Sequence, residues 1–378
     1  MPNKNICVHQ FWILFCMIGV LILQQSLLFA QHRYAFLNEI LTIGDSSESE
    51  HYLFRNPTGI RTDKNGNIYV SDRNSSQIKV FNKDGEFVNA YGSKGKGPGE
   101  FQEVTSFHVT SEFDLLIFDH VSQKMSIKKS GDEHFLDDVL SFDEYVKVHQ
   151  ILETENDELV IFYTSNSSYR KGELNLKIQA GSDFRDISID ANKIWDLDES
   201  FNRAALIFAQ VNLWLHRDIL LISPAYYSGN VFVSDIEEGI ISQNITGFQP
   251  VLPTYKILPE DYINKERTNT SMYSGQAGRF IAKIYNSSRG ITVIDNEILE
   301  FVFMDKNPDV VKNDLQFGVN RFTLDGEFLG FYEIRNHPKK NADTFYMKLM
   351  WKDDQDQLYF VDTLNEPVIR VMKISFED

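Results

Sequence analysis

Eight side chains spread along the chain have the types and spacing to form a binding site for a polar ligand. They combine cations, amides, imidazoles and one indole, groups that hydrogen-bond to and stack on a sugar or a peptide. The two repeat positions that supply most of them hold no carboxylate, which disfavours acid–base catalysis, and we predict no catalytic residue. The predicted ligand-binding residues are Arg61, His108, His149, Gln150, Gln210, Asn212, Arg289 and Trp351.

The histidines are the residues best suited to hold a metal ion. The chain has nine, and a catalytic metal usually needs three protein ligands and an open fourth position. No two histidines have i, i+4 or His-x-His spacing. His108 and His149 are expected on innermost strands that face a common channel. We predict that they pack in or near this channel, with no bound metal or other cofactor. A metal-dependent lyase or hydrolase with a channel site remains the alternative.

One acidic segment is similar to the opening of a calcium loop. It reads Asp-Lys-Asn-Gly-Asn from Asp63 to Asn67, but no Glu occupies the closing position of such a loop. The matching segment from Asp353 to Gln357 lacks the glycine. Both segments are therefore predicted to be tight turns. The chain also lacks a Gly-x-Ser-x-Gly nucleophile motif and a phosphate-binding glycine loop.

An internal repeat supplies the elements that must position these residues. Its clearest copy has β-rich segments at 56–60, 68–72, 77–81 and 86–92, with Asn-Gly and Asp-Gly turns at Asn65-Gly66 and Asp84-Gly85. Such turns are strong hairpin signals because glycine accepts the positive φ that they require. Four antiparallel strands in about 45 residues form one blade of a β-propeller.

The second strand of this unit recurs along the whole chain. The copies lie at 68–72, 115–119, 159–162, 219–223, 298–303 and 358–362. Six copies predict an all-β fold, a six-bladed β-propeller of four-stranded antiparallel blades. After the last copy only a third strand follows, whereas an extra strand at 36–44 precedes the first blade. We expect this N-terminal strand to pair with the C-terminal blade and close the ring, which removes open sheet edges.

The repeat gives domain boundaries and two channel-facing positions. The predicted blades are 56–101, 102–146, 147–191, 206–248, 288–335 and 345–378 with strand 36–44, and the insertion is 249–287, which contains a possible short helix at 260–267. One inner-strand position holds Arg61, His108, Leu152, Asn212, Ile291 and Trp351. The position two residues earlier holds Gly59, Ser106, Gln150, Gln210, Arg289 and Leu349.

The first repeat resembles the NHL-repeat family of β-propellers. The resemblance rests on Asn-Gly-Asn-Ile-Tyr-Val-Ser-Asp at 65–72 and on the glycine-rich passage 91–101, which closes on Pro-Gly-Glu-Phe. The later copies are divergent and similar to the exported six-bladed propellers of Bacteroidota. Some NHL-like propellers are lyases with channel histidines on a metal, and lactonase-like propellers hold calcium. Neither ligand set transfers residue by residue, because the later blades do not match closely.

The first thirty residues are predicted to be a signal peptide. Lys4 precedes an apolar stretch at 11–23, and Ala30 supplies a small residue for cleavage before Gln31. Thirteen apolar residues are short for a membrane span. Cys7 and Cys16 both lie in this segment. We therefore expect an exported mature domain, 31–378, in the periplasm or at the cell surface, without thiols or a membrane span.

The net charge of the chain disfavours two classes of binding partner. A net charge of −17 argues against nucleic acid, because that binding depends on Lys and Arg at phosphates, and against anionic membrane surfaces. The sequence favours an exported NHL-like propeller that acts as a non-enzymatic scaffold for a small polar molecule, a glycan or a protein in the cell envelope. The insertion 249–287 is a possible docking segment for a protein partner.

Overall fold

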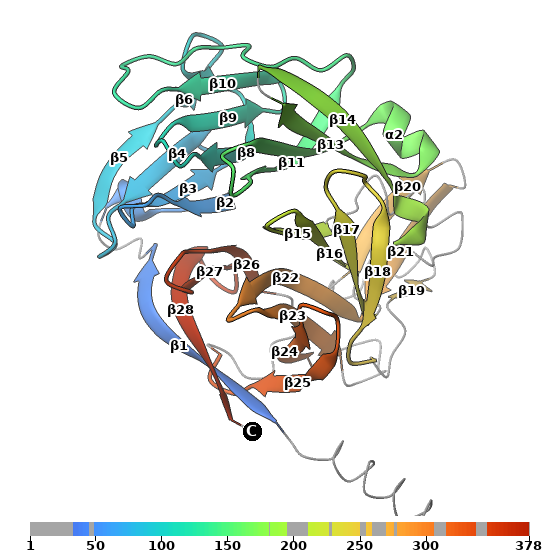
Figure 1. Cartoon of the computed structure of the whole chain (residues 1–378). Helices are drawn as coiled ribbons and strands as arrows, with labels where there is room; N and C mark the ends of the chain where they lie inside the picture. Colours follow the sequence, from blue (N-terminus) through green and yellow to red (C-terminus); the bar gives the residue numbers. More distant parts are fainter. Residues whose placement is uncertain are drawn as a thin grey trace, which may run out of the picture.

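The strands of the computed structural model follow the repeat seen in the sequence. The structure describes residues 33–44, 49–180, 182–194, 211–226, 229–249, 255–258, 270–275, 278–305, 315–337 and 346–377. Successive antiparallel sheets are arranged in a ring, with the first strand of each sheet towards the centre (Figure 1). The all-β propeller fold is therefore confirmed. The predicted signal peptide lies outside the described residues.

The first blade is a four-stranded antiparallel sheet with the strand order of the chain. Its strands match the segments that the repeat predicts, to within two residues at each end. They are β2 (Pro57–Thr62), β3 (Ile68–Asp72), β4 (Gln77–Phe81) and β5 (Phe87–Tyr91). The short strands β6 (Ser93–Lys94) and β7 (Glu100–Phe101) pair within the glycine-rich passage that leads to the next blade.

Asp63 fixes the turn between β2 and β3. Its carboxylate accepts hydrogen bonds of 2.9 Å from the backbone amides of Asn65 and Asn67, and one of 3.3 Å from the hydroxyl of Tyr69. Gly66 takes the positive φ, +82°, that the turn requires.

The same arrangement recurs 290 residues later in the last blade. Asp353 accepts hydrogen bonds from the amides of Gln355 and Gln357 and from the hydroxyl of Tyr359, at 2.8 to 2.9 Å. Both carboxylates are thus occupied by donors of their own turns.

Five further groups of consecutive strands continue the ring in the described part of the chain. The second sheet has three strands, and a bridge between Ile127 and Leu136 extends it on the outer side. Its strands are β8 (Val104–Val109), β9 (Leu115–Asp119) and β10 (Lys124–Lys128). The third and fourth sheets are β11 (Val146–Glu153), β12 (Leu159–Ser165), β13 (Glu173–Ala180) and β14 (Asp183–Asp190), then β15 (Val211–His216), β16 (Ile219–Pro224), β17 (Asn230–Asp235) and β18 (Ile241–Thr246). The last two groups are β22 (Asn286–Ile294), β23 (Glu297–Asp305), β24 (Leu315–Thr323) and β25 (Phe328–Ile334), then β26 (Met347–Lys352), β27 (Leu358–Asp362) and β28 (Val368–Glu377).

The N-terminal strand β1 (Tyr34–Ile43) lies beside the C-terminal strand. It pairs antiparallel with β28, from Tyr34 opposite Glu377 to Ile43 opposite Ile369. The side chain of Asn336 also holds it, accepting from the Leu37 amide at 2.7 Å and donating to the Leu37 carbonyl at 2.8 Å. The order β26-β27-β28-β1 thus gives four strands, and a short parallel pairing of β1 with β25 joins them to the preceding blade.

The core lies between neighbouring sheets. Strands β9 and β27 are buried along their whole length, because both faces of a propeller sheet pack on adjacent sheets. This explains why their sequences read as continuous apolar segments rather than alternating ones. The largest apolar cluster joins the last two sheets and contains Phe301, Phe317 and Phe360, each at most 1% exposed.

The described residues of the insertion between the fourth and fifth sheets form strands. A separate three-stranded sheet is formed by β19 (Tyr255–Leu258), β20 (Thr270–Gly275) and β21 (Gly278–Ile284). The expected short helix at 260–267 lies outside the described residues. Strand β22 begins at Asn286, inside the range predicted for the insertion.

Helical structure is limited to short segments in the described residues. They are α2 (Asn166–Lys171), η1 (Glu50–Tyr52) and η2 (Ala191–Lys193). None of these helices has the length and the apolar character needed to cross a bilayer.

Candidate functional site

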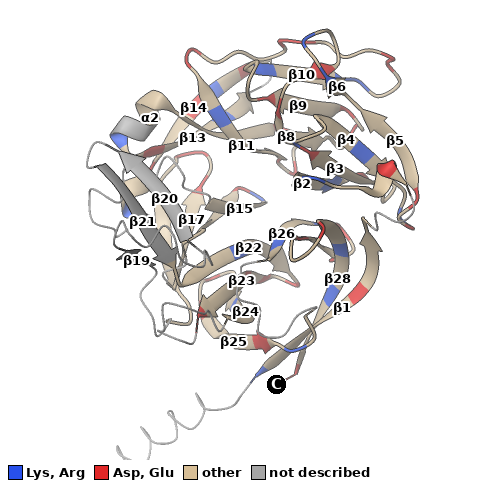
Figure 2. Ribbon diagram, turned by 180° about the vertical axis from the view of Figure 1, so that it is seen from behind, with Lys and Arg blue, Asp and Glu red and all other residues tan. Residues whose placement is uncertain are grey.

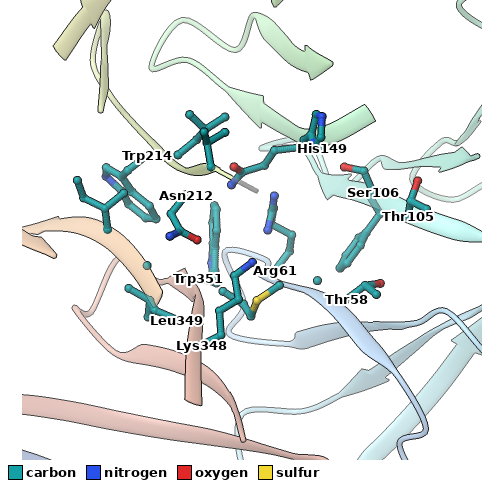
Figure 3. A pocket seen from close by; sticks show the side chains of 18 residues that line it. Thr58, Arg61, Thr105, Ser106, His149, Asn212, Trp214, Lys348, Leu349 and Trp351 are labelled. Carbon is teal, nitrogen blue, oxygen red and sulfur yellow. The ribbon is translucent and has the colours of Figure 1, made fainter. Parts of the chain in front are cut away.

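A cavity of about 110 Å³ lies where the inner strands meet (Figure 3). All six inner strands, β2, β8, β11, β15, β22 and β26, contribute to its lining. One ordered water needs about 10–15 Å³ of such space, so the cavity has room for a small organic molecule. It is the candidate site.

Five of the predicted ligand-binding residues line this cavity. They are Arg61, His149, Gln150, Asn212 and Trp351. Gln210 lies outside the described residues. The structure thus brings together on one cavity residues that are up to 290 positions apart in the sequence.

His108 and Arg289 are not among the described residues that line this cavity. His108 is 4% exposed, and its Nε2 atom lies 3.5 Å from the carboxylate of Glu153. Burial lowers the pKa of His108, and Glu153 acts in the opposite direction. Arg289 donates from Nε to the carbonyl of Met347 at 3.0 Å. Both side chains are used for packing between neighbouring blades.

β-Bulges interrupt the alternation of side chains along the inner strands. Strands β2, β8, β11, β22 and β26 each carry a register shift within the segment that borders the cavity. A bulge puts two residues opposite one and interrupts the alternation of faces. In β26, consecutive residues from Lys348 to Trp351 therefore line the cavity. Strict alternation in the sequence could not predict Lys348.

Gly290 sits in the bulge of β22, where a side chain would not fit. Its φ is +139°, and a Cβ atom there would lie 2.5 Å from the Cβ atom of Leu349. The glycine lets β22 and β26 approach closely at the cavity wall.

Arg61 connects several blades at the cavity. Its Nη1 donates to the carbonyl of Ile60 at 2.7 Å, and its Nη2 donates to the carbonyl of Ile151, on β11, at 3.2 Å. The guanidinium lies 4.6 Å from the ring centre of Trp351, a cation–π contact. Trp351 is fixed in turn, because its Nε1 donates to Thr62 Oγ1 at 2.9 Å. Burial lowers the pKa of Arg61 to about 10, so this side chain stays cationic at neutral pH.

Lys348 is a second cation in the lining. Burial, followed by the charges of Arg289 and Lys147, lowers the pKa of Lys348 to about 8. Among the described residues, Lys348 makes no hydrogen bond or ion pair. Lys and Arg positions on the inner strands β22 and β26 are visible near the centre of the ring in Figure 2.

His149 is a neutral member of the lining. Its Nε2 lies 2.8 Å from Thr164 Oγ1. Burial, with smaller effects of Lys147 and Lys348, lowers the pKa of His149 to about 3, so the imidazole is uncharged at neutral pH. The described lining contains no Asp or Glu.

Two tryptophans form an aromatic wall. The rings of Trp214 and Trp351 lie 5.6 Å apart between centres, inclined by 50°. Trp214 was not predicted, because the aligned position in β15 was assigned to Asn212 two residues earlier. Indole faces are suited to stacking with the uncharged face of a ligand.

A buried polar network runs from the cavity into the body of the ring. Asn212 donates from Nδ2 to the Ser288 carbonyl at 3.1 Å, and Ser288 Oγ lies 2.5 Å from Ser223 Oγ. Ser223 then donates to the carboxylate of Glu300 at 2.5 Å, and Asn320 donates to the same carboxylate at 3.0 Å.

Glu300 is fully buried in this network. Burial raises the pKa of Glu300 to about 7, although the hydrogen bonds from Ser223, Asn320 and Ser288 act in the opposite direction. Glu300 was not predicted, because it lies on a second strand, β23, whose other residues are mostly apolar.

A second cavity of about 320 Å³ adjoins the first, and Trp214 borders both. It lies at the turns that follow the inner strands and is rich in charged groups of both signs. These are Glu153, Glu155, Arg217, Asp295, Lys352 and Asp356. The two cavities therefore differ in charge character.

Potential metal ligands do not converge in the part of the chain that the structure describes. No group of three or more His, Cys, Asp or Glu side chains there could hold a metal ion. His108 contacts Glu153 and His149 contacts Thr164, so the two predicted candidates have separate partners.

Comparison with protein families supports the number of blades. The model of the DUF5128 family, described as a 6-bladed β-propeller, matches residues 49–179, about a third of the chain. No curated protein matches the sequence.

Comparison with solved structures shows the same fold. The chain is similar to a member of the DUF4221 family from Bacteroides vulgatus, with a TM-score of 0.52 and 11% identity over 92% of this chain and 100% of that chain. It also matches a Bacteroides fragilis protein described as exported (TM-score 0.49, 13% identity, 92% and 96% covered). A third match is virginiamycin B lyase from Staphylococcus aureus (TM-score 0.41, 12% identity, 89% and 99% covered). Identities this low carry information about the fold alone.

Proposed function

We propose that this protein is an exported six-bladed propeller that acts as a non-enzymatic binding scaffold in the cell envelope. Its central cavity takes a small polar ligand, which is either free or part of a glycan or protein. One observation carries the proposal: all six inner strands converge on a cavity that combines unengaged polar groups with two indole faces. This combination is typical of small-molecule binding sites.

Polar groups of the lining are available for a ligand. Gln150 and Lys348 line the cavity and make no side-chain hydrogen bond with a described residue. Asn212 uses its amide nitrogen for Ser288, which leaves its carbonyl oxygen as an acceptor. Donors and acceptors of this kind fix the orientation of a bound polar molecule.

The lining favours binding over the metal-dependent alternative. A hydrolase or lyase needs a nucleophile with an adjacent base, or a metal, within reach of the substrate. The Nε2 atom of His149 is engaged by Thr164, which is not a lining residue. Lys348, with a pKa lowered to about 8, makes no hydrogen bond with a described residue that could serve as a nucleophile. The described lining therefore contains no hydrogen-bonded pair of a nucleophile and a base.

Export and ring closure complete the proposal. We assign residues 1–30 to a cleaved signal peptide and the mature domain to 31–378, in the periplasm or at the cell surface. We assign β1 the role of closing the ring, supported by its pairing with β28 along almost its whole length. Cell fractionation and N-terminal sequencing of the secreted form test the first assignment.

Tryptophan fluorescence offers a direct test of ligand binding. The chain has four tryptophans, and the two that the structure describes, Trp214 and Trp351, both border the cavity. A panel of sugars, peptides and organic acids should contain a ligand that changes the emission saturably at one site per chain. The change should be reduced in Trp351→Phe and in Trp214→Phe, whose side chains border the cavity. Measured turnover of a hydrolase or lyase substrate, without such a ligand, would contradict the proposal.

A further inference from the structure

We propose that the ligand of the central cavity is a sugar that bears an anionic group, a carboxylate or a sulfate, with the anion at Lys348 and Arg61 and the sugar ring against Trp351 and Trp214. The inference rests on the proposed function and specifies its ligand class.

The charge of the lining is opposite to that of the chain. The protein has 54 Asp and Glu against 37 Lys and Arg. About two or three carboxylates would be expected by chance among the 18 lining residues, but none is present, whereas Arg61 and Lys348 are. The cavity is therefore a local cationic site in an acidic protein. Such a site attracts anions and disfavours cations.

Lys348 lacks a counter-ion in the described structure. The charged groups that act on it, Arg289 and Lys147, are both cations. A partly buried cation without a partner lowers the stability of the fold, whereas an anion placed beside it forms a charge-assisted hydrogen bond. An anionic group of the ligand would therefore pair with this ammonium group.

Arg61 is held in position before any ligand arrives. Two backbone carbonyls and the face of Trp351 fix its guanidinium, and no described carboxylate pairs with it. A guanidinium has five N–H donors, and the two hydrogen bonds leave some of them unengaged. A fixed cation loses little conformational freedom on binding, which favours affinity.

The remaining lining groups suit a sugar ring. The indoles of Trp214 and Trp351 present apolar faces, and the amides of Gln150 and Asn212 can pair with hydroxyl groups. An inorganic anion could bind to the cations but would make no contact with the indole faces. An anionic sugar could contact the cations, the indole faces and the amides.

The test compares acidic and neutral sugars that are otherwise matched. Calorimetry with D-glucuronate and D-galacturonate, with D-glucose and D-galactose, and with inorganic sulfate is run on the wild-type protein. The uronates should bind about tenfold or more tightly than the neutral hexoses, as expected for a hydrogen bond to a charged group.

Two matched lysine variants locate the effect. Lys348→Met should remove the preference for uronates and raise the melting temperature of the ligand-free protein, because an unpaired, partly buried charge is replaced by an apolar chain. Lys352→Met, on the same strand but in the second cavity beside Asp356, should keep the preference. The melting temperatures show that both variants fold.

Three results would overturn the inference. Neutral hexoses that bind as tightly as the uronates would refute the anionic class but leave the binding scaffold intact. A preference that survives in Lys348→Met would refute the assigned position. No binding of uronates or sulfate up to about 10 mM would refute the inference, whereas the scaffold proposal would fall only if the wider ligand panel also found no binder.

Discussion

Replacement of Glu300 by glutamine is expected to remove a pH-dependent loss of stability from the protein. Glu300 is fully buried, and its hydrogen-bond partners Ser223 and Asn320 are neutral. Burial raises the pKa of Glu300 from 4.5 to about 7 in the folded state. The folded protein therefore disfavours the carboxylate form relative to the unfolded chain.

The sign and size of the effect follow from the two pKa values. Below about pH 4.5 the group is protonated in both states, and its contribution to the free energy of unfolding is fully present. Between pH 4.5 and 7 this contribution is lost as the pH rises, because the unfolded state ionises first. A shift from 4.5 to about 7 corresponds to about 3 kcal/mol lost at pH 8. Glutamine keeps the shape and the polar character but does not ionise.

Urea denaturation between pH 5 and 8 measures the effect. The difference in free energy of unfolding between wild type and Glu300→Gln should shift by about 2–3 kcal/mol in favour of the variant over this range. Glu327→Gln, an exposed carboxylate of the same blade, controls for the general loss of one negative charge. If the difference in free energy of unfolding between the wild type and Glu300→Gln stays constant with pH, the argument that burial raises the pKa of Glu300 is refuted.

Three further predictions concern the N-terminal strand, the acidic turn and the metal alternative. Leu37→Ala should cost about 2–5 kcal/mol in urea denaturation, because Leu37 is 1% exposed, whereas Ile40→Ala, 51% exposed in the same strand, should cost little; equal costs would argue against a structural role for β1. Asp63→Ala should lower stability by about 1–2 kcal/mol through the lost turn hydrogen bonds, and millimolar calcium should not change the melting temperature of the wild type; a calcium-dependent rise would contradict the turn interpretation. Elemental analysis should find no stoichiometric metal in the purified protein; a metal that is lost in His108→Gln or His149→Gln would favour the lyase or hydrolase alternative.

The fold was predictable because its signals are local. The Asn-Gly turn at Gly66 and the Asp-Gly turn at Gly85 both take positive φ, as such hairpins require. The apolar second strands recur along the chain, and they remain recognisable although loops of different length change the distance between them. A repeat needs only these short-range patterns to be detected.

The site was predictable only in part, because its details depend on contacts between blades. Arg61 and Trp351 were found from their spacing, and both line the cavity. His108 contacts Glu153 and is not among the described lining residues. Lys348 was missed because a bulge in β26 breaks the alternation on which the prediction depended. Glu300 was missed since its burial depends on packing between the fourth and fifth sheets. No pattern within a single strand reveals such neighbours.

The pairing of β1 with β28 has a consequence for the order in which the protein folds. Tyr34 lies opposite Glu377, so a sheet that contains the first described strand cannot be completed until the last residues have been synthesised. Contacts between residues so far apart in the chain also form slowly. The sheet that contains β1 and β28 is therefore expected to form late in folding, after the strands of the other blades have paired with their sequence neighbours.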